Sequence, residues 1–124
     1  MQVFFGGISV SIEHIRAGKL RALAVTGAKP APALPGVPTV SELVPGYEAY
    51  VWDAMGAPAK TPPDIVELLN KEINAVLSDP AMQARLVDLG AEPMIMTTAE
   101  FGAYIASETE KWGKVIKSAG IKPD

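Results

Sequence analysis

The sequence contains no cysteine and only one histidine among its 124 residues. The absence of cysteine excludes disulfides, cysteine-ligated zinc, iron–sulfur clusters and cysteine nucleophiles. His14 has no second histidine with which to share a metal, and no G-x-S-x-G motif is present to make it the base of a serine triad. We therefore interpret His14 as a surface residue of a helix, and we predict neither a metal nor a cofactor.

Long apolar runs and an excess of positive charge are also missing. No apolar run reaches the roughly 18 residues of a membrane span, and the first residues lack the charged region and cleavage site of a signal peptide. The net charge is −3 without a basic patch, which argues against nucleic-acid binding. The mean hydropathy of +0.19 predicts either a large core or an apolar surface that meets a partner.

Short apolar, β-prone runs predict four strands, at residues 2–5, 20–26, 47–53 and 92–96. Between the first two, apolar residues recur at helical spacing over 8–17, with Ser9 or Ser11 as a candidate N-cap and Gly18 as the stop. This strand–helix–strand order predicts two parallel strands. The opening of the chain directly inside a strand suggests a piece of a longer protein.

Residues 27–46 hold five prolines and cannot form regular structure for long. Thr39 and Glu42 have the spacing of a capping box, which predicts one helical turn. We interpret the segment as a connector or a functional loop.

Three helices are expected after residue 60, each with a local start signal. The start signals are Thr61 followed by Pro62 and Asp64, Asp79 followed by Pro80, and Thr98. Gly90 and Gly120 are predicted to end the second and third of these helices. Each helix carries one apolar face, which should pack on a core.

The turn at Gly6, Gly7, Ser9 and Ser11 is the strongest candidate site. A strand ends there, the glycines let a ligand approach the backbone, and a helix N-terminus follows. Its free N–H groups and the helix dipole suit a carboxylate or phosphate. The spacing matches neither a dinucleotide fingerprint nor a phosphate-binding P-loop. A tight turn with capping serines, without ligand function, explains the same residues.

Trp52 and Asp53, at the end of the third predicted strand, are weaker candidates. A carboxylate at a strand end can face a cleft, although a strand-end cap or a loop hydrogen bond is the simpler explanation of Asp53. Trp52 either lines a cleft or packs in the core.

Several strings resemble one family, in the same order along the chain. They are 13–26 (EHIRAGKLRALAVT), 35–40 (PGVPTV), 45–48 (PGYE), 57–62 (APAKTP), 86–92 (LVDLGAE), Glu100-Phe101 and Lys111-Trp112. Together they resemble the C-terminal part of the Bug-type extracytoplasmic solute-binding proteins, the receptors of tripartite tricarboxylate transporters.

The resemblance implies an α/β fold of the type II periplasmic-binding-protein class, present only as its C-terminal portion, with short parallel-type strands and flanking helices. It implies that residues 1–26 end the second lobe. Residues 27–46 are then a proline-rich interlobe connector, and 47–124 form the C-terminal part of the first lobe.

The resemblance also implies a function. The intact protein would be a periplasmic receptor, not an enzyme, that binds a small organic acid or amino acid between two lobes and presents it to membrane permease subunits. Gly6, Gly7, Ser9 and Ser11 would face the ligand with Phe5 beside them, and Trp52 and Asp53 would lie on the opposite lobe. Gly6 stands where members often have an acidic or polar residue, so the resemblance does not identify the solute.

Two alternatives use other features of the sequence. A chain that lacks the N-terminal part would expose sheet edges and apolar faces, and would act as a self-associating module, as a homo-oligomer or by domain exchange. An enzyme with its site at Asp53 or at the Gly6–Ser11 turn is the other alternative, but no nucleophile–base pair supports it.

Overall fold

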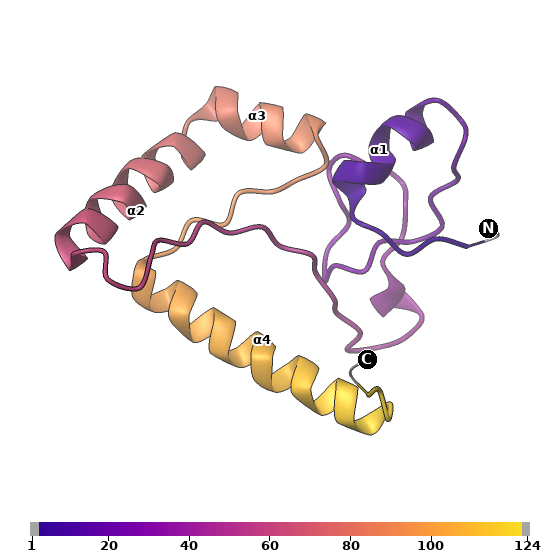
Figure 1. Cartoon of the computed structure of the whole chain (residues 1–124). Helices are drawn as coiled ribbons and strands as arrows, with labels where there is room; N and C mark the ends of the chain where they lie inside the picture. Colours follow the sequence, from indigo (N-terminus) through magenta and orange to yellow (C-terminus); the bar gives the residue numbers. More distant parts are fainter. Residues whose placement is uncertain (1–2, 123–124) are drawn as a thin grey trace.

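The computed structural model describes residues 3–122 and consists of helices joined by long extended segments. The helices are α1 (Ile8–Arg16), a short 3₁₀ turn η1 (Val40–Glu42), α2 (Pro63–Leu77), α3 (Pro80–Asp88) and α4 (Thr98–Ser118). Figure 1 shows α2 and α3 in succession along one side and α4 along another, with α1 and the coil of residues 18–46 at one end. No helix of the described residues is both long and apolar enough to span a membrane.

The four predicted strands are wrong for the described residues, which contain no strand. The only pairing there is an isolated parallel bridge between Val25 and Thr39. Residues 3–5, 20–26, 47–53 and 92–96 do not pair with one another as a ladder, so the expected parallel strand–helix–strand unit is not formed; Gln2 lies outside the described residues. A strand is defined by its neighbour, and these segments have no neighbouring strands.

Helix starts follow local sequence signals, with corrections to the predicted caps of α1, α2 and α4. Asp79 caps α3 as expected, because its carboxylate accepts hydrogen bonds from the N–H groups of Ala81 and Met82 at 2.9 and 3.0 Å. Helix α4 is capped by Thr97 and not by Thr98. Only Thr97 lies three residues before Glu100, whose carboxylate accepts the Thr97 N–H at 2.8 Å and closes a capping box.

The predicted cap of α2 at Thr61 is also wrong, because Pro62 takes that position. A residue before proline is driven out of the helical region, and Pro62 precedes Pro63. Pro62 is therefore extended, with φ −55° and ψ 140°, and the helix begins at Pro63.

Neither serine caps α1, contrary to expectation. The N-cap is Gly7, and both serines lie inside the helix. The Ser11 hydroxyl instead donates to the Gly7 carbonyl oxygen four residues earlier, at 3.0 Å.

The predicted capping box at η1 is confirmed, since the Thr39 N–H donates to Glu42 at 3.0 Å. The three glycine stops are also confirmed. Gly18, Gly90 and Gly120 follow α1, α3 and α4 with φ of 69°, 77° and 65°, a region that favours glycine.

A small core lies between α1 and the proline-rich segment. Ile12 of α1, Val25 and Leu34 are buried and contact one another, and Val25 also donates its N–H to Pro38 at 2.9 Å. Leu34 belongs to the predicted connector, so this segment packs as part of the α1 end of the molecule. The division at residues 26 and 46 remains a prediction.

The apolar faces of α2 and α4 are largely uncovered. The accessible surface is 9808 Å², whereas a compact protein of this mass exposes about 6,400 Å². The helical periodicity thus predicted the faces correctly, but little of the described structure packs on them.

Candidate solute-binding site

The candidate site at the start of α1 offers backbone donors without a side-chain acceptor. Gly7 is the N-cap, with φ −59° and ψ 147°, and no side chain caps the helix. The first N–H groups of a helix have no intrahelical partner, and the helix dipole adds partial positive charge there. This end of α1 can therefore accept a carboxylate.

The structure gives the predicted residues of this segment different roles. Phe5 is 85% exposed, and Gly6 is exposed and so close to the Phe4 ring that a Cβ would collide with it. Ser9 is exposed, and its hydroxyl forms no hydrogen bond within residues 3–122. Ser11 is buried, and its hydroxyl donates a hydrogen bond to the carbonyl oxygen of Gly7. Ser11 therefore stabilises the turn from its buried side.

Trp52 and Asp53 are not brought to this segment by any hydrogen bond among the described residues. The Trp52 ring instead packs edge-on against Phe101 and Tyr104 of α4, with ring centroids 5.9 and 5.8 Å apart. Burial and the nearby Glu108 carboxylate raise the pKa of Tyr104. Asp53 is exposed. Trp52 thus fixes the extended segment to α4, and the role of both residues toward a ligand remains a prediction.

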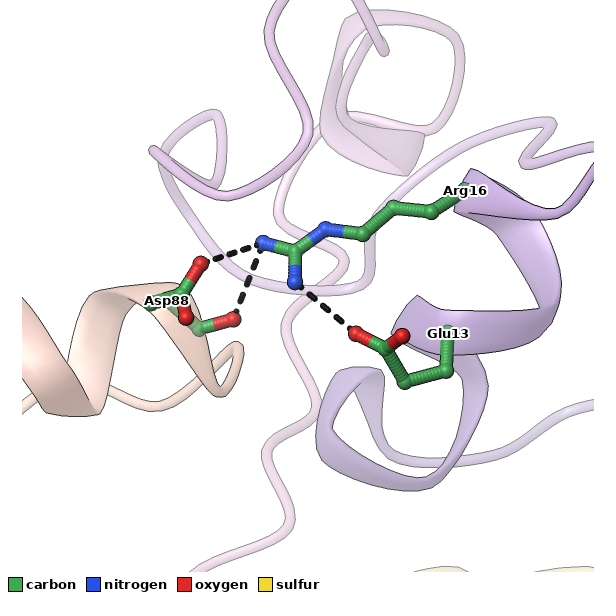
Figure 2. Close-up of polar contacts among 3 residues, drawn as sticks. All are labelled: Glu13, Arg16 and Asp88. Atoms are coloured by element: carbon green, nitrogen blue, oxygen red, sulfur yellow. Dashed lines mark hydrogen bonds and ion pairs between the residues drawn. The ribbon is translucent and has the colours of Figure 1, made fainter.

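Sequence reasoning missed the contact that holds α1 in place. Figure 2 shows the Arg16 guanidinium of α1 between Glu13 and Asp88, the last residue of α3. It donates to Asp88 Oδ1 at 2.7 Å, to the Asp88 main-chain oxygen at 3.0 Å and to Glu13 at 2.8 Å. The hydrogen bond with Asp88, followed by that with Glu13, raises the pKa of Arg16.

Close packing accompanies this ion pair. A Cβ added to Gly90 would lie 2.5 Å from Ile8 Cγ2 and 3.2 Å from the Ile8 carbonyl carbon. The first residue of α1, whose N–H belongs to the candidate ligand-binding backbone, therefore touches the turn that ends α3. The Glu13-x-x-Arg16 spacing was visible in the sequence, but nothing local pointed to Asp88, 72 residues away.

The buried carboxylate of Glu108 has a structural role. It pairs with Lys111 and accepts a hydrogen bond from Trp112 Nε1 at 2.9 Å. The Lys111 hydrogen bond, and then that of Trp112, lower the pKa of Glu108 against the opposing effect of burial. Its charge is satisfied within α4, so it is not available as a catalytic acid or base.

Other parts of the described structure offer weaker sites. Within residues 3–122 no three His, Cys, Asp or Glu side chains gather as metal ligands would. A broad hollow of about 700 Å³ lies between α2 and α3, lined by Glu72, Ala75, Val76, Asp79, Ala81, Met82 and Arg85. It is open to solvent and does not enclose a ligand.

Comparison with solved structures defines the class of protein. Rpa4515 of R. palustris, solved with adipate, matches 94% of this chain with a TM-score of 0.87 and 39% identity. The periplasmic binding protein BugD matches 92% of it with a TM-score of 0.81 and 34% identity. The fold is therefore that of part of a periplasmic binding protein, and the chain covers 40% and 39% of these two proteins.

Sequence comparison then gives the family. The family model described as the tripartite tricarboxylate transporter family receptor matches residues 5–121, so the chain belongs to this family. A UPF0065 protein from the clcB-clcD intergenic region of Pseudomonas knackmussii is 34% identical over 118 residues, which are 94% of this chain and 70% of the relative. Protein BugT of Bordetella pertussis is 39% identical over 90% of this chain, but only 34% of BugT is covered. The predicted family and fold class are confirmed, apart from the strands.

Proposed function

We propose that this chain contributes to a receptor that binds a small carboxylate-bearing solute, with the start of α1 as one wall of the binding site. The uncapped N-terminus of α1 carries the proposal, because it offers backbone N–H groups and positive potential to an anion. Ser9 adds a hydroxyl beside these donors. The adipate in the Rpa4515 structure supports a carboxylate as the ligand class.

The receptor role places the protein in the periplasm, where it delivers an organic acid or amino acid to membrane permease subunits. The family and the similarity to BugD support this location and partner. The role needs no chemical step, and no catalytic residue is assigned.

Binding by this chain alone should be in the millimolar range, because a two-lobed receptor grips its solute from both sides and Trp52 and Asp53 are not joined to α1. Adipate titrated into isotope-labelled protein, followed by amide chemical shifts, tests the proposal. The largest changes should fall on the amides of Gly7, Ile8 and Ser9. Micromolar affinity would contradict the claim that this chain alone supplies only one side of the binding site.

Two controls separate anion binding from general effects. The neutral diamide adipamide has the same length as adipate and should leave these amides unchanged. Ser9→Ala should weaken adipate binding, while Ser107→Ala on α4 should not. Equal responses to both ligands, or changes centred on the hollow between α2 and α3, would refute the assignment.

A further inference from the structure

Helix α1 is attached to the end of α3 at both of its own ends. Ile8, the first residue of α1, packs on Gly90, and Arg16, the last, forms an ion pair with Asp88. The two residues of α1 lie about 12 Å apart along the helix axis, whereas their partners are neighbours in one turn of chain. Contacts at both ends of a short helix fix its direction as well as its place.

The contact made by Arg16 is directional. Figure 2 shows that Arg16 Nη2 donates to Oδ1 and to the main-chain oxygen of Asp88, at 2.7 and 3.0 Å, while Nη1 donates to Glu13 at 2.8 Å. The main-chain oxygen belongs to the last residue of α3, where helical carbonyl groups lack intrahelical partners and favour a cation. Because the guanidinium is a rigid plane and Glu13 holds it from α1, the contact transmits the direction of one helix to the other.

The junction beside this ion pair is a packing contact. A hollow of about 20 Å³ remains next to Ile8, lined among others by Ala31 of the proline-rich segment and by Val87 and Gly90 at the end of α3. This volume holds about one water molecule and is too small for a solute. The first turn of α1 is therefore wedged between two other segments, and the junction is not a second binding site.

The apolar core places α1 without the help of Arg16. Ile12 is buried, and Ile8 and Ile15 pack against the same core, so one face of the helix is held by apolar contacts. Such contacts are non-directional and tolerate small rotations of the helix. The side chains of Arg16 and Asp88 are 43% and 72% exposed, and an exposed ion pair adds little to stability. Loss of the ion pair should thus leave the fold intact and change mainly the direction of α1.

We propose that Arg16 is a positioning residue for solute binding, which aims the first N–H groups of α1 at the solute carboxylate through its contacts with Asp88. The candidate donors on Gly7, Ile8 and Ser9 are backbone groups, so they cannot turn independently of the helix. Hydrogen bonds weaken steeply as the donor angle departs from linearity, and a rotation of α1 misaligns all these donors together. The inference rests on the proposed function and adds a residue at the opposite end of α1, which does not touch the solute.

Adipate titrations followed by the amides of residues 7–9 test this role. Without the ion pair, α1 spends part of its time in other directions, and the apparent Kd rises in proportion. Arg16→Gln should raise the Kd about two- to fivefold, within the strength of an exposed ion pair. Asp88→Ala should raise it less, because the main-chain oxygen remains, and the double variant should bind no more weakly than Arg16→Gln alone. The urea midpoints of the variants should change little. Unchanged affinity in both single variants would overturn the proposal.

A matched control separates positioning from simple attraction between charges. Lys19→Gln removes the same charge near α1, but Lys19 forms no ion pair within residues 3–122, so affinity should stay unchanged. If Arg16 acted only by long-range attraction, Lys19→Gln would weaken binding and Asp88→Ala, which removes a negative charge, would strengthen it. Either result would overturn the proposal.

The same titrations distinguish this inference from the proposed function. Absence of adipate binding by the unsubstituted protein would overturn the proposed function and this inference with it. Binding by the unsubstituted protein with equal affinity in the Arg16 and Asp88 variants would overturn this inference alone.

Discussion

Gly90 gives the sharpest test of how α1 sits against α3, because the chain supplies matched controls. Gly18, Gly90 and Gly120 each follow a helix as the left-handed stop, with φ between 65° and 77°. In each case the next residue donates its N–H to a carbonyl five positions earlier, at 2.9 to 3.1 Å. The three sites therefore share one backbone geometry and differ in their surroundings.

The surroundings determine the expected cost of alanine. A left-handed conformation costs a residue with a Cβ about 1–2 kcal/mol, and this should be the whole effect of Gly18→Ala and Gly120→Ala, where a Cβ would meet no atom within 4 Å. At Gly90 the Cβ would lie 2.5 Å from Ile8 Cγ2, and the resulting overpacking adds about 1–3 kcal/mol. Gly90→Ala should thus lower the free energy of unfolding by about 2–5 kcal/mol in total.

Urea unfolding followed by circular dichroism measures these differences. Ile8→Ala removes Cγ2, so Gly90→Ala introduced into that variant should cost little more than the control substitutions, and a double-mutant cycle will show the coupling. If all three alanine variants lose the same stability, or if the cycle shows no coupling, then Ile8 does not pack on Gly90 in solution. The position of the candidate ligand-binding turn would then need another explanation.

Two further predictions concern α4 and the turn before it. Because the pKa of Glu108 is lowered in the folded state, its ionised form stabilises the protein above the unfolded glutamate pKa of about 4.3, and this contribution is lost as the pH falls through the lowered value. Glu108→Gln should flatten the decline of unfolding free energy between neutral and acidic pH, and a decline equal to that of the unsubstituted protein would contradict the assignment. The side-chain amides of Asn70 and Asn74 both donate to the Met96 carbonyl, at 3.0 and 2.8 Å. After either single change to alanine, the remaining amide still donates to the Met96 oxygen, whereas the double variant leaves this oxygen without a donor. The double variant should therefore lose about 1–3 kcal/mol more unfolding free energy than either single variant. Purely additive losses in urea unfolding would count against this shared role.

Helix boundaries were predictable because their signals are local. Asp79 before Pro80 and the glycines at 18, 90 and 120 act within one turn of chain, and the structure shows them where the sequence predicted them. The errors at Thr61 and Thr98 are each one residue, and arise where two adjacent residues compete for the cap. Ser9 and Ser11 failed as caps because α1 begins at Ile8, before either of them.

Strands and distant contacts were not predictable for a different reason. The runs at 47–53 and 92–96 have strand-like composition, but a ladder needs a neighbour that the described residues do not provide. The candidate site at the start of α1 could be predicted because its glycines and serines all lie within residues 6–11. Its attachment through Arg16 and Asp88 joins positions 72 residues apart, which no local pattern reveals.

The two amide donors on Met96 also constrain how a sheet could be completed. A carbonyl oxygen has two lone pairs, and in this structure Asn70 and Asn74 occupy the Met96 oxygen from α2. An incoming strand can therefore exchange hydrogen bonds with the residues before Met96 but finds no acceptor at Met96 itself. Helix α2 thus limits the length of any ladder on this segment, because carbonyl oxygens that accept from a neighbouring strand must lie before Met96.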